Sequence, residues 1–191
     1  VQVTSLWGNR LLAAEMWFKH NPNSSRATVY LAAIRNNEWK DSSAALQILD
    51  QRLKTCPYCL PIAIQAVMLS CTLEPEQKLQ SRLASIEAVV KNGFVLSQGI
   101  VQDLENLNDM IKRGKCPAIS WPRLEGINRL LLENRSVQAS GQSEGLHVIL
   151  DSILREQGEY SRAMDELQAA WKIIRNHGIA YLMVDLGINQ K

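Results

Sequence analysis

Apolar side chains recur every three to four residues along most of this chain, which is the spacing of an amphipathic helix. The first such segment closes at His20–Pro22, because proline commonly follows the end of a helix. Ser24 and Ser25 can cap a second helix, which Asn36 and Asn37 then end. Alternation typical of a β-strand never extends over four residues without a helical alternative. We therefore expect an all-α fold.

Helix starts and stops continue in the same way through the rest of the chain. Asp41 caps a third helix that stops at Thr55–Pro57, and Pro75 opens a helix after a short apolar one at Leu60–Cys71. The Ser- and Gln-rich segment 136–143 is the most linker-like part of the chain. Further helices are expected over 100–111, from Ser120 to Leu131, over 146–156 and over 161–174.

The expected helices form repeating pairs. Pro22 and Pro57 stand 35 residues apart, and sliding the sequence by that interval preserves the apolar pattern. A later segment carries small residues where two helices would cross and a Gly-x-Tyr turn between them: Leu150, Leu154, Gly158, Tyr160, Ala163, Leu167 and Ala170. This segment resembles the tetratricopeptide (TPR) consensus. The resemblance implies a right-handed superhelix of antiparallel helix pairs, in which each pair buries its apolar face against the next.

The TPR resemblance covers about two thirds of the chain, which we expect to form a single domain over residues 1–191. The clearest repeats are 26–59 and 144–175, and the helix pairs in 60–135 are diverged. The first repeat has Asn37–Trp39 where the later one has its Gly-x-Tyr turn, and the last has Arg175 where the consensus usually has proline.

In TPR proteins the ligand-facing side chains lie on the first helix of each pair, and the ligand is a protein or peptide. Carried onto this sequence, the resemblance implies a non-catalytic interaction domain whose concave face binds a partner through Tyr30, Ile34, Asn37, Gln65, Leu69, Val148, Ser152 and Arg155. Tyr30, Gln65 and Arg155 are the strongest candidates, because they are polar-tipped residues on otherwise apolar helices.

The opening of the chain carries a second resemblance. The segment from Trp7 through Trp17 to Ala27 is similar to the start of the TPR arrays that follow the last membrane span of some bacterial polytopic proteins. Those proteins include TMTC-like proteins, O-antigen polymerases and protein O-oligosaccharyltransferases. The resemblance implies a periplasmic tail, tethered to the membrane through a segment outside this chain and linked to surface glycan assembly or protein glycosylation. The alternative is a soluble cytosolic TPR adaptor.

Four cysteines allow either reduced thiols or disulfides: Cys56, Cys59, Cys71 and Cys116. In an oxidising compartment, Cys59 and Cys71 at opposite ends of one helix would lie on the order of 16 Å apart, too far for a bond. Pairing Cys56 with Cys59, or Cys71 with Cys116, remains open. The motif Cys56-Pro-Tyr-Cys59 is also similar to the redox motif of glutaredoxins, which makes a thiol oxidoreductase a further alternative. A helix precedes the motif, however, where glutaredoxins have a strand.

Composition and residue spacing argue against several other classes of function. A net charge of +2 without a dense basic block argues against a nucleic-acid binder. The longest apolar run is 60–71, well short of the roughly 20 residues that cross a bilayer. The cysteine and histidine spacings match no metal site, and no catalytic or phosphate-binding motif is present. We therefore expect neither a cofactor nor a metal.

Overall fold

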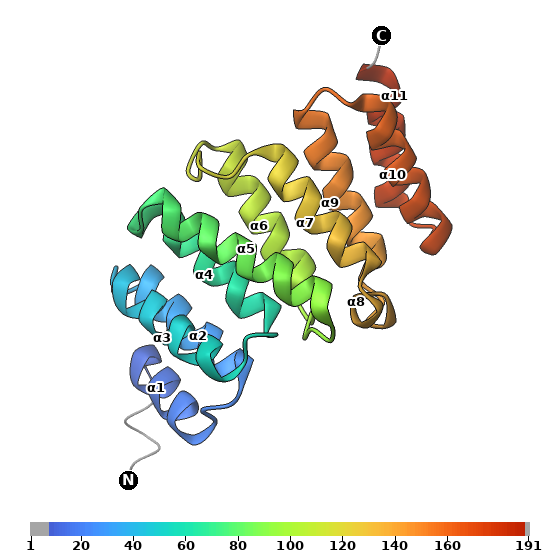
Figure 1. The fold of residues 1–191 in the computed structure, drawn as a ribbon. Coiled ribbons are helices and arrows are strands. Elements are labelled where there is room, and N and C mark those ends of the chain that lie inside the picture. The colour runs from blue at the N-terminus through green and yellow to red at the C-terminus, as the bar shows by residue number, and fades with distance from the viewer. Residues whose placement is uncertain (1–7, 190–191) are drawn as a thin grey trace.

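The computed structural model describes residues 8–189, and these fold into eleven α-helices without a β-strand (Figure 1). The all-α prediction is confirmed. The helices are α1 (Arg10–His20), α2 (Ser25–Asn37), α3 (Ser42–Thr55), α4 (Leu60–Leu73), α5 (Glu76–Asn92), α6 (Ile100–Lys112), α7 (Trp121–Glu133), α8 (Arg135–Ala139), α9 (Ser143–Glu156), α10 (Tyr160–Ile173) and α11 (His177–Asn189).

The helices form a stack that runs from α1 to α11 (Figure 1). The tightest neighbours are α9 with α10 and α2 with α3, each joined by a short connection. A second set of contacts links helices that are not consecutive. In this set, α4 packs on α2 and α6, and α6 packs on α9. This arrangement is compatible with a helical-repeat fold, in which each unit contacts only its neighbours.

Local signals in the sequence set several helix ends. The Ser24 hydroxyl accepts a hydrogen bond from Ala27 N at 3.2 Å, and Asp41 Oδ1 accepts one from Ala44 N at 3.0 Å. Each bond satisfies an amide that the first helical turn leaves without a partner. Gly158 has a φ of +75°, so the turn between α9 and α10 uses the left-handed conformation that glycine adopts freely.

Two helices depart from the sequence prediction. The expected linker contains α8, because Asn134 Oδ1 caps it by accepting from Ser136 N at 3.0 Å and because Val137 is fully buried. The prediction also stopped at residue 174, whereas α11 follows. Ile179 and Leu186 of α11 are buried, and Leu186 joins an apolar cluster with Leu154, Ala163 and Leu167.

The largest apolar cluster lies in the middle of the stack and runs from α4 to α9. Smaller clusters join α2, α3 and α4 at one end, α1 to α2, and α9 to α10 and α11 at the other end. Within residues 8–189, no helix combines the length and the apolar character that a membrane crossing requires. Trp7, with which the second sequence resemblance begins, lies outside the described residues.

Candidate functional site

Polar side chains link the neighbouring helices α4, α6, α9 and α11. The first link joins α4 to α6, where Gln65 Nε2 donates to Asp103 Oδ1 at 2.6 Å. Asp103 is buried, and burial raises the pKa of its carboxyl to about 6, although the hydrogen bond from Gln65 acts in the opposite direction. A carboxyl that is costly to ionise therefore lies between two packed helices.

The second link joins α6 to α9. Asn108 Nδ2 donates to the Ser152 hydroxyl at 2.9 Å, and only 5% of Asn108 is exposed. Its Oδ1 has no hydrogen-bond partner among the described residues. The helices approach closely at this interface, because a Cβ added to Gly145 would lie 2.7 Å from Val101 Cγ1. An unpaired acceptor of this kind costs free energy unless a donor reaches it.

The third link joins α9 to α11 through Arg155. Its guanidinium donates to Asp151 Oδ1 at 2.8 Å on its own helix, and to Asp185 Oδ2 at 2.9 Å and the Leu182 carbonyl at 3.1 Å on α11. Asp151 is 2% exposed, and burial raises the pKa of its carboxyl despite the neighbouring guanidinium. The ion pair therefore connects the last helix to the stack.

A groove of about 450 Å³ opens along the second and third links. Its size falls within the range of cavities that hold ligands. Three of the residues that the TPR resemblance assigned to partner binding line it together: Val148, Ser152 and Arg155. The other lining residues are Gln102, Glu105, Asn106, Asn108, Asp109 and Lys112 of α6, Ile149 and Asp151 of α9, and Leu182 of α11.

The other five residues of that set do not line this groove. Gln65 belongs to the link between α4 and α6, and Leu69 packs against the apolar cluster that α2, α3 and α4 share. On α2, the Tyr30 ring packs at a tilt against Trp17 of α1 with ring centroids 5.6 Å apart, and Ile34 is 2% exposed. Both lie in a cluster with α1, which covers this part of α2.

Asn37 is exposed at the end of α2, and its Oδ1 accepts a hydrogen bond from Asn36 Nδ2. The predicted set is therefore brought together on α9 and not on α2. The lining residues of α6 were missed, because no repeat could be recognised between residues 92 and 143. The feature of the sequence that could have identified these residues is the row of polar side chains between the apolar positions of 100–111.

The four cysteines form two disulfides in the structure, Cys56–Cys59 and Cys71–Cys116. These are the two pairings that helix geometry left open. Cys56 and Cys59 are at most 1% exposed, and α3 precedes them. A thiol oxidoreductase exchanges its disulfide with a substrate thiolate, which needs access to a sulfur. The burial of this pair therefore argues against that alternative.

A larger cavity, of about 580 Å³, lies between the ends of α5 and α7. One polar side chain at its wall is already used, because Asn134 Nδ2 donates to the carbonyls of Val90 at 2.7 Å and Gly93 at 2.8 Å. Its Oδ1 caps α8. Both the Nδ2 and the Oδ1 of Asn134 are therefore already hydrogen-bonded to the backbone, so this side chain offers a ligand no unpaired group.

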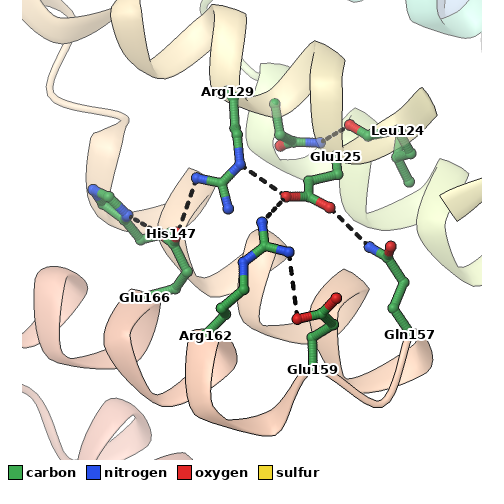
Figure 2. Close-up of polar contacts among 9 residues, drawn as sticks. Leu124, Glu125, Arg129, His147, Gln157, Glu159, Arg162 and Glu166 are labelled. Carbon is green, nitrogen blue, oxygen red and sulfur yellow. Dashed lines mark hydrogen bonds and ion pairs between the residues drawn. The ribbon is translucent and has the colours of Figure 1, made fainter. Parts of the chain in front are cut away.

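Charged side chains form a separate cluster where α7, α9 and α10 meet (Figure 2). Glu125 accepts hydrogen bonds from Arg129 at 2.8 Å, from Gln157 at 3.0 Å and from Arg162. Burial raises the pKa of Glu125, but these hydrogen bonds and Arg162 outweigh it and leave the pKa lowered. Each charge in this cluster therefore has an opposite charge beside it, which suits a clamp between helices.

Glu166 extends the charged cluster to α9. Its carboxylate lies 2.6 Å from His147 Nδ1 and accepts a hydrogen bond from Arg129 at 3.2 Å. Burial raises the pKa of Glu166, but the interactions with His147 and Arg129 outweigh it and lower the pKa. Among residues 8–189, no three His, Cys, Asp or Glu side chains gather as metal ligands would.

Comparison with known proteins places no constraint on this site. No protein-family model matches the sequence, and no curated protein is significantly similar to it.

Proposed function

We propose that this domain is a non-catalytic interaction module of the TPR type, and that it binds an extended polypeptide in the groove between α6, α9 and α11. The observation that carries the proposal is a groove of about 450 Å³ in which Val148, Ser152 and Arg155 lie together, since these are the α9 positions that the TPR resemblance assigns to partner binding. A polypeptide backbone offers an amide donor at every residue except proline, and the polar side chains of the groove can accept from it.

The assignment to the TPR type rests on how α9 and α10 pack. Ala163 and Ala170 are both fully buried, which agrees with small residues at the helix crossing. Gly158 takes the left-handed turn that the consensus requires, and Leu154 and Leu167 pack in one cluster with α11. These features support a repeat whose first helix, α9, presents its ligand-facing positions to the groove.

We also propose that the domain works in an oxidising compartment, as the periplasmic tail of a membrane protein involved in surface glycan assembly or protein glycosylation. The support is the placement of all four cysteines within bonding distance in two pairs, since disulfides persist mainly outside the cytosol. Mass spectrometry of the unreduced, alkylated protein from its native cell tests this setting. Two bridges are expected, and four alkylated thiols would instead indicate a cytosolic adaptor.

Selection from a random peptide library displayed on phage tests the binding function directly. Selected peptides should bind the wild-type domain and bind at least about tenfold more weakly to Ser152→Trp, because the indole fills the groove. Ser161→Trp is the matched control, since Ser161 is exposed on α10 and outside the groove. Val148→Trp is a second groove variant, and circular dichroism checks that each variant folds. Failure to select any peptide, or equal binding to all variants, would contradict the proposal.

A further inference from the structure

The cationic residues that line the groove have stronger charged partners than two of its acidic residues. Its two cationic lining residues are already held by carboxylates: Lys112 lies 3.2 Å from Glu156, and Arg155 binds Asp151 and Asp185. Two acidic lining residues on α6 have only weak partners. Glu105 is exposed and accepts one hydrogen bond of 3.2 Å from the neutral Gln102. The groove therefore has an excess of negative charge.

Asp109 lies one helical turn beyond Glu105 and lines the same groove. Among residues 8–189, it forms an ion pair with Arg113 on its own helix at 3.4 Å, and both side chains are more than 60% exposed. Exposed pairs of this geometry contribute little energy, so the Asp109 carboxylate can exchange partners readily. Glu105 and Asp109 therefore present two carboxylates on one side of the groove.

Asn108 lies between these two residues on α6, but it is 95% buried and donates to Ser152 through its Nδ2. The charged lining residues that lack a strong partner are therefore the two carboxylates. A complementary occupant must donate hydrogen bonds and carry positive charge.

We propose that the polypeptide bound in this groove is a basic segment whose lysine or arginine side chains pair with Glu105 and Asp109. The inference rests on the proposed function and adds the chemistry of the partner. A segment rich in acidic residues would meet like charges on α6 and would be repelled. The association is also screened by salt, because the two carboxylates are exposed.

Fluorescence anisotropy with three labelled peptides tests the charge preference. Each probe is a short Gly-Ser peptide that carries arginine, glutamine or glutamate at every third position. The arginine peptide should bind at least about tenfold more tightly than the glutamine peptide, the glutamate peptide should not bind, and about 0.5 M NaCl should remove the difference. The variant Glu105→Gln/Asp109→Asn should bind the arginine peptide about tenfold more weakly. Both residues are exposed, so the variant is expected to fold.

The matched control is Glu76→Gln/Asp165→Asn, which changes the net charge equally at exposed positions outside the groove and should bind like the wild type. Equal loss in both variants would overturn the inference, because the effect would then follow net charge alone. It is also overturned if the glutamine peptide binds as tightly as the arginine peptide, or if library peptides that depend on Ser152 lack basic residues. In those last two cases the proposed function stands. If no peptide of either experiment binds, both proposals fail.

Discussion

The face formed by α2 and the face formed by α9 occupy equivalent places in the proposed repeats, but the structure treats them differently. On α2, Tyr30 and Ile34 pack beneath α1 in an apolar cluster. On α9, Val148 and Ser152 border a polar groove whose other wall is α6. The first helix of a proposed repeat is therefore covered at one end of the stack and accessible at the other. A binding role cannot be transferred along a repeat without asking which helix packs next to it.

The two ends also differ in what holds their helices together. Near α4 the connections are apolar clusters and two disulfides. Between α6 and α11, hydrogen bonds and ion pairs between partly buried side chains are added to the apolar clusters. Polar links of this kind contribute little net stability, but they are costly to break on one side only. The α9 end therefore adds directional polar contacts to its apolar packing.

The largest expected effect comes from the long disulfide. Replacing Cys71 and Cys116 by alanine should lower the free energy of unfolding by about 4 kcal/mol, because the bond closes a loop with a sequence separation of 45. The same change at Cys56 and Cys59, with a separation of 3, should cost about 2 kcal/mol. Urea unfolding of the oxidised proteins measures both values. Equal losses would show that loop length does not govern the stabilisation.

Alanine at one position on each of the two faces sharpens the comparison next. Ile34→Ala should cost about 3 kcal/mol, because the side chain is 2% exposed and leaves a cavity under α1. Val148→Ala should cost less than about 1 kcal/mol, because the side chain borders the groove. The same urea experiment compares them. A loss at Val148 as large as that at Ile34 would contradict the assignment of the α9 face as accessible.

The buried carboxyl between α4 and α6 predicts a pH dependence. The pKa of Asp103 is raised to about 6 in the folded state, above its ordinary value near 4, so the folded state binds more protons between these values. Stability should therefore fall by about 2 kcal/mol as the pH rises from 4 to above 6. Asp103→Asn keeps an acceptor for Gln65 and should remove this fall.

Thermal unfolding of the wild type and Asp103→Asn at several pH values measures the effect. The variant should be the more stable protein at pH 7.5, and the two proteins should converge near pH 4. Parallel pH profiles would show that Asp103 ionises without cost in the folded protein.

The smallest expected effect concerns the charged cluster of α7, α9 and α10. Glu125→Gln should lower the unfolding free energy by about 1 kcal/mol, because its three donors lose a charged acceptor. The pKa of Glu125 is lowered in the folded state, so this contribution is present at neutral pH and is lost as the pH falls through that lowered value. Glu133→Gln, exposed on the same helix, is the control and should change little.

Most helices could be predicted because residues close in the sequence mark where a helix begins or ends. Ser24 and Asp41 each accept a capping hydrogen bond from an amide three residues ahead, and Gly158 marks its turn through a conformation that few other residues adopt. α11 was missed because residues 177–189 are apolar on nearly every side, so no polar face marks a period. α8 was missed because its signal, the Asn134 cap, starts a helix of only five residues.

The groove could be predicted only from the α9 side. Val148, Ser152 and Arg155 followed from a recognisable repeat, whereas Asn108 comes from a segment without one. Asn108 and Ser152 are 44 residues apart, and nothing local in either sequence says that they meet. The covering of Tyr30 by Trp17 was equally invisible, because it depends on where α1 docks.

The bond between Cys71 and Cys116 also has a mechanical consequence. It encloses α5 and α6 in a covalent loop, whereas α9 lies outside it. A chain stretched from its two ends could extend through α9, but the 45-residue loop, about 160 Å when extended, would stay out of the line of force. One wall of the groove is thus shielded from tension and the other is exposed to it. Pulling on the chain would release an occupant by peeling α9 away from an α6 that stays in place.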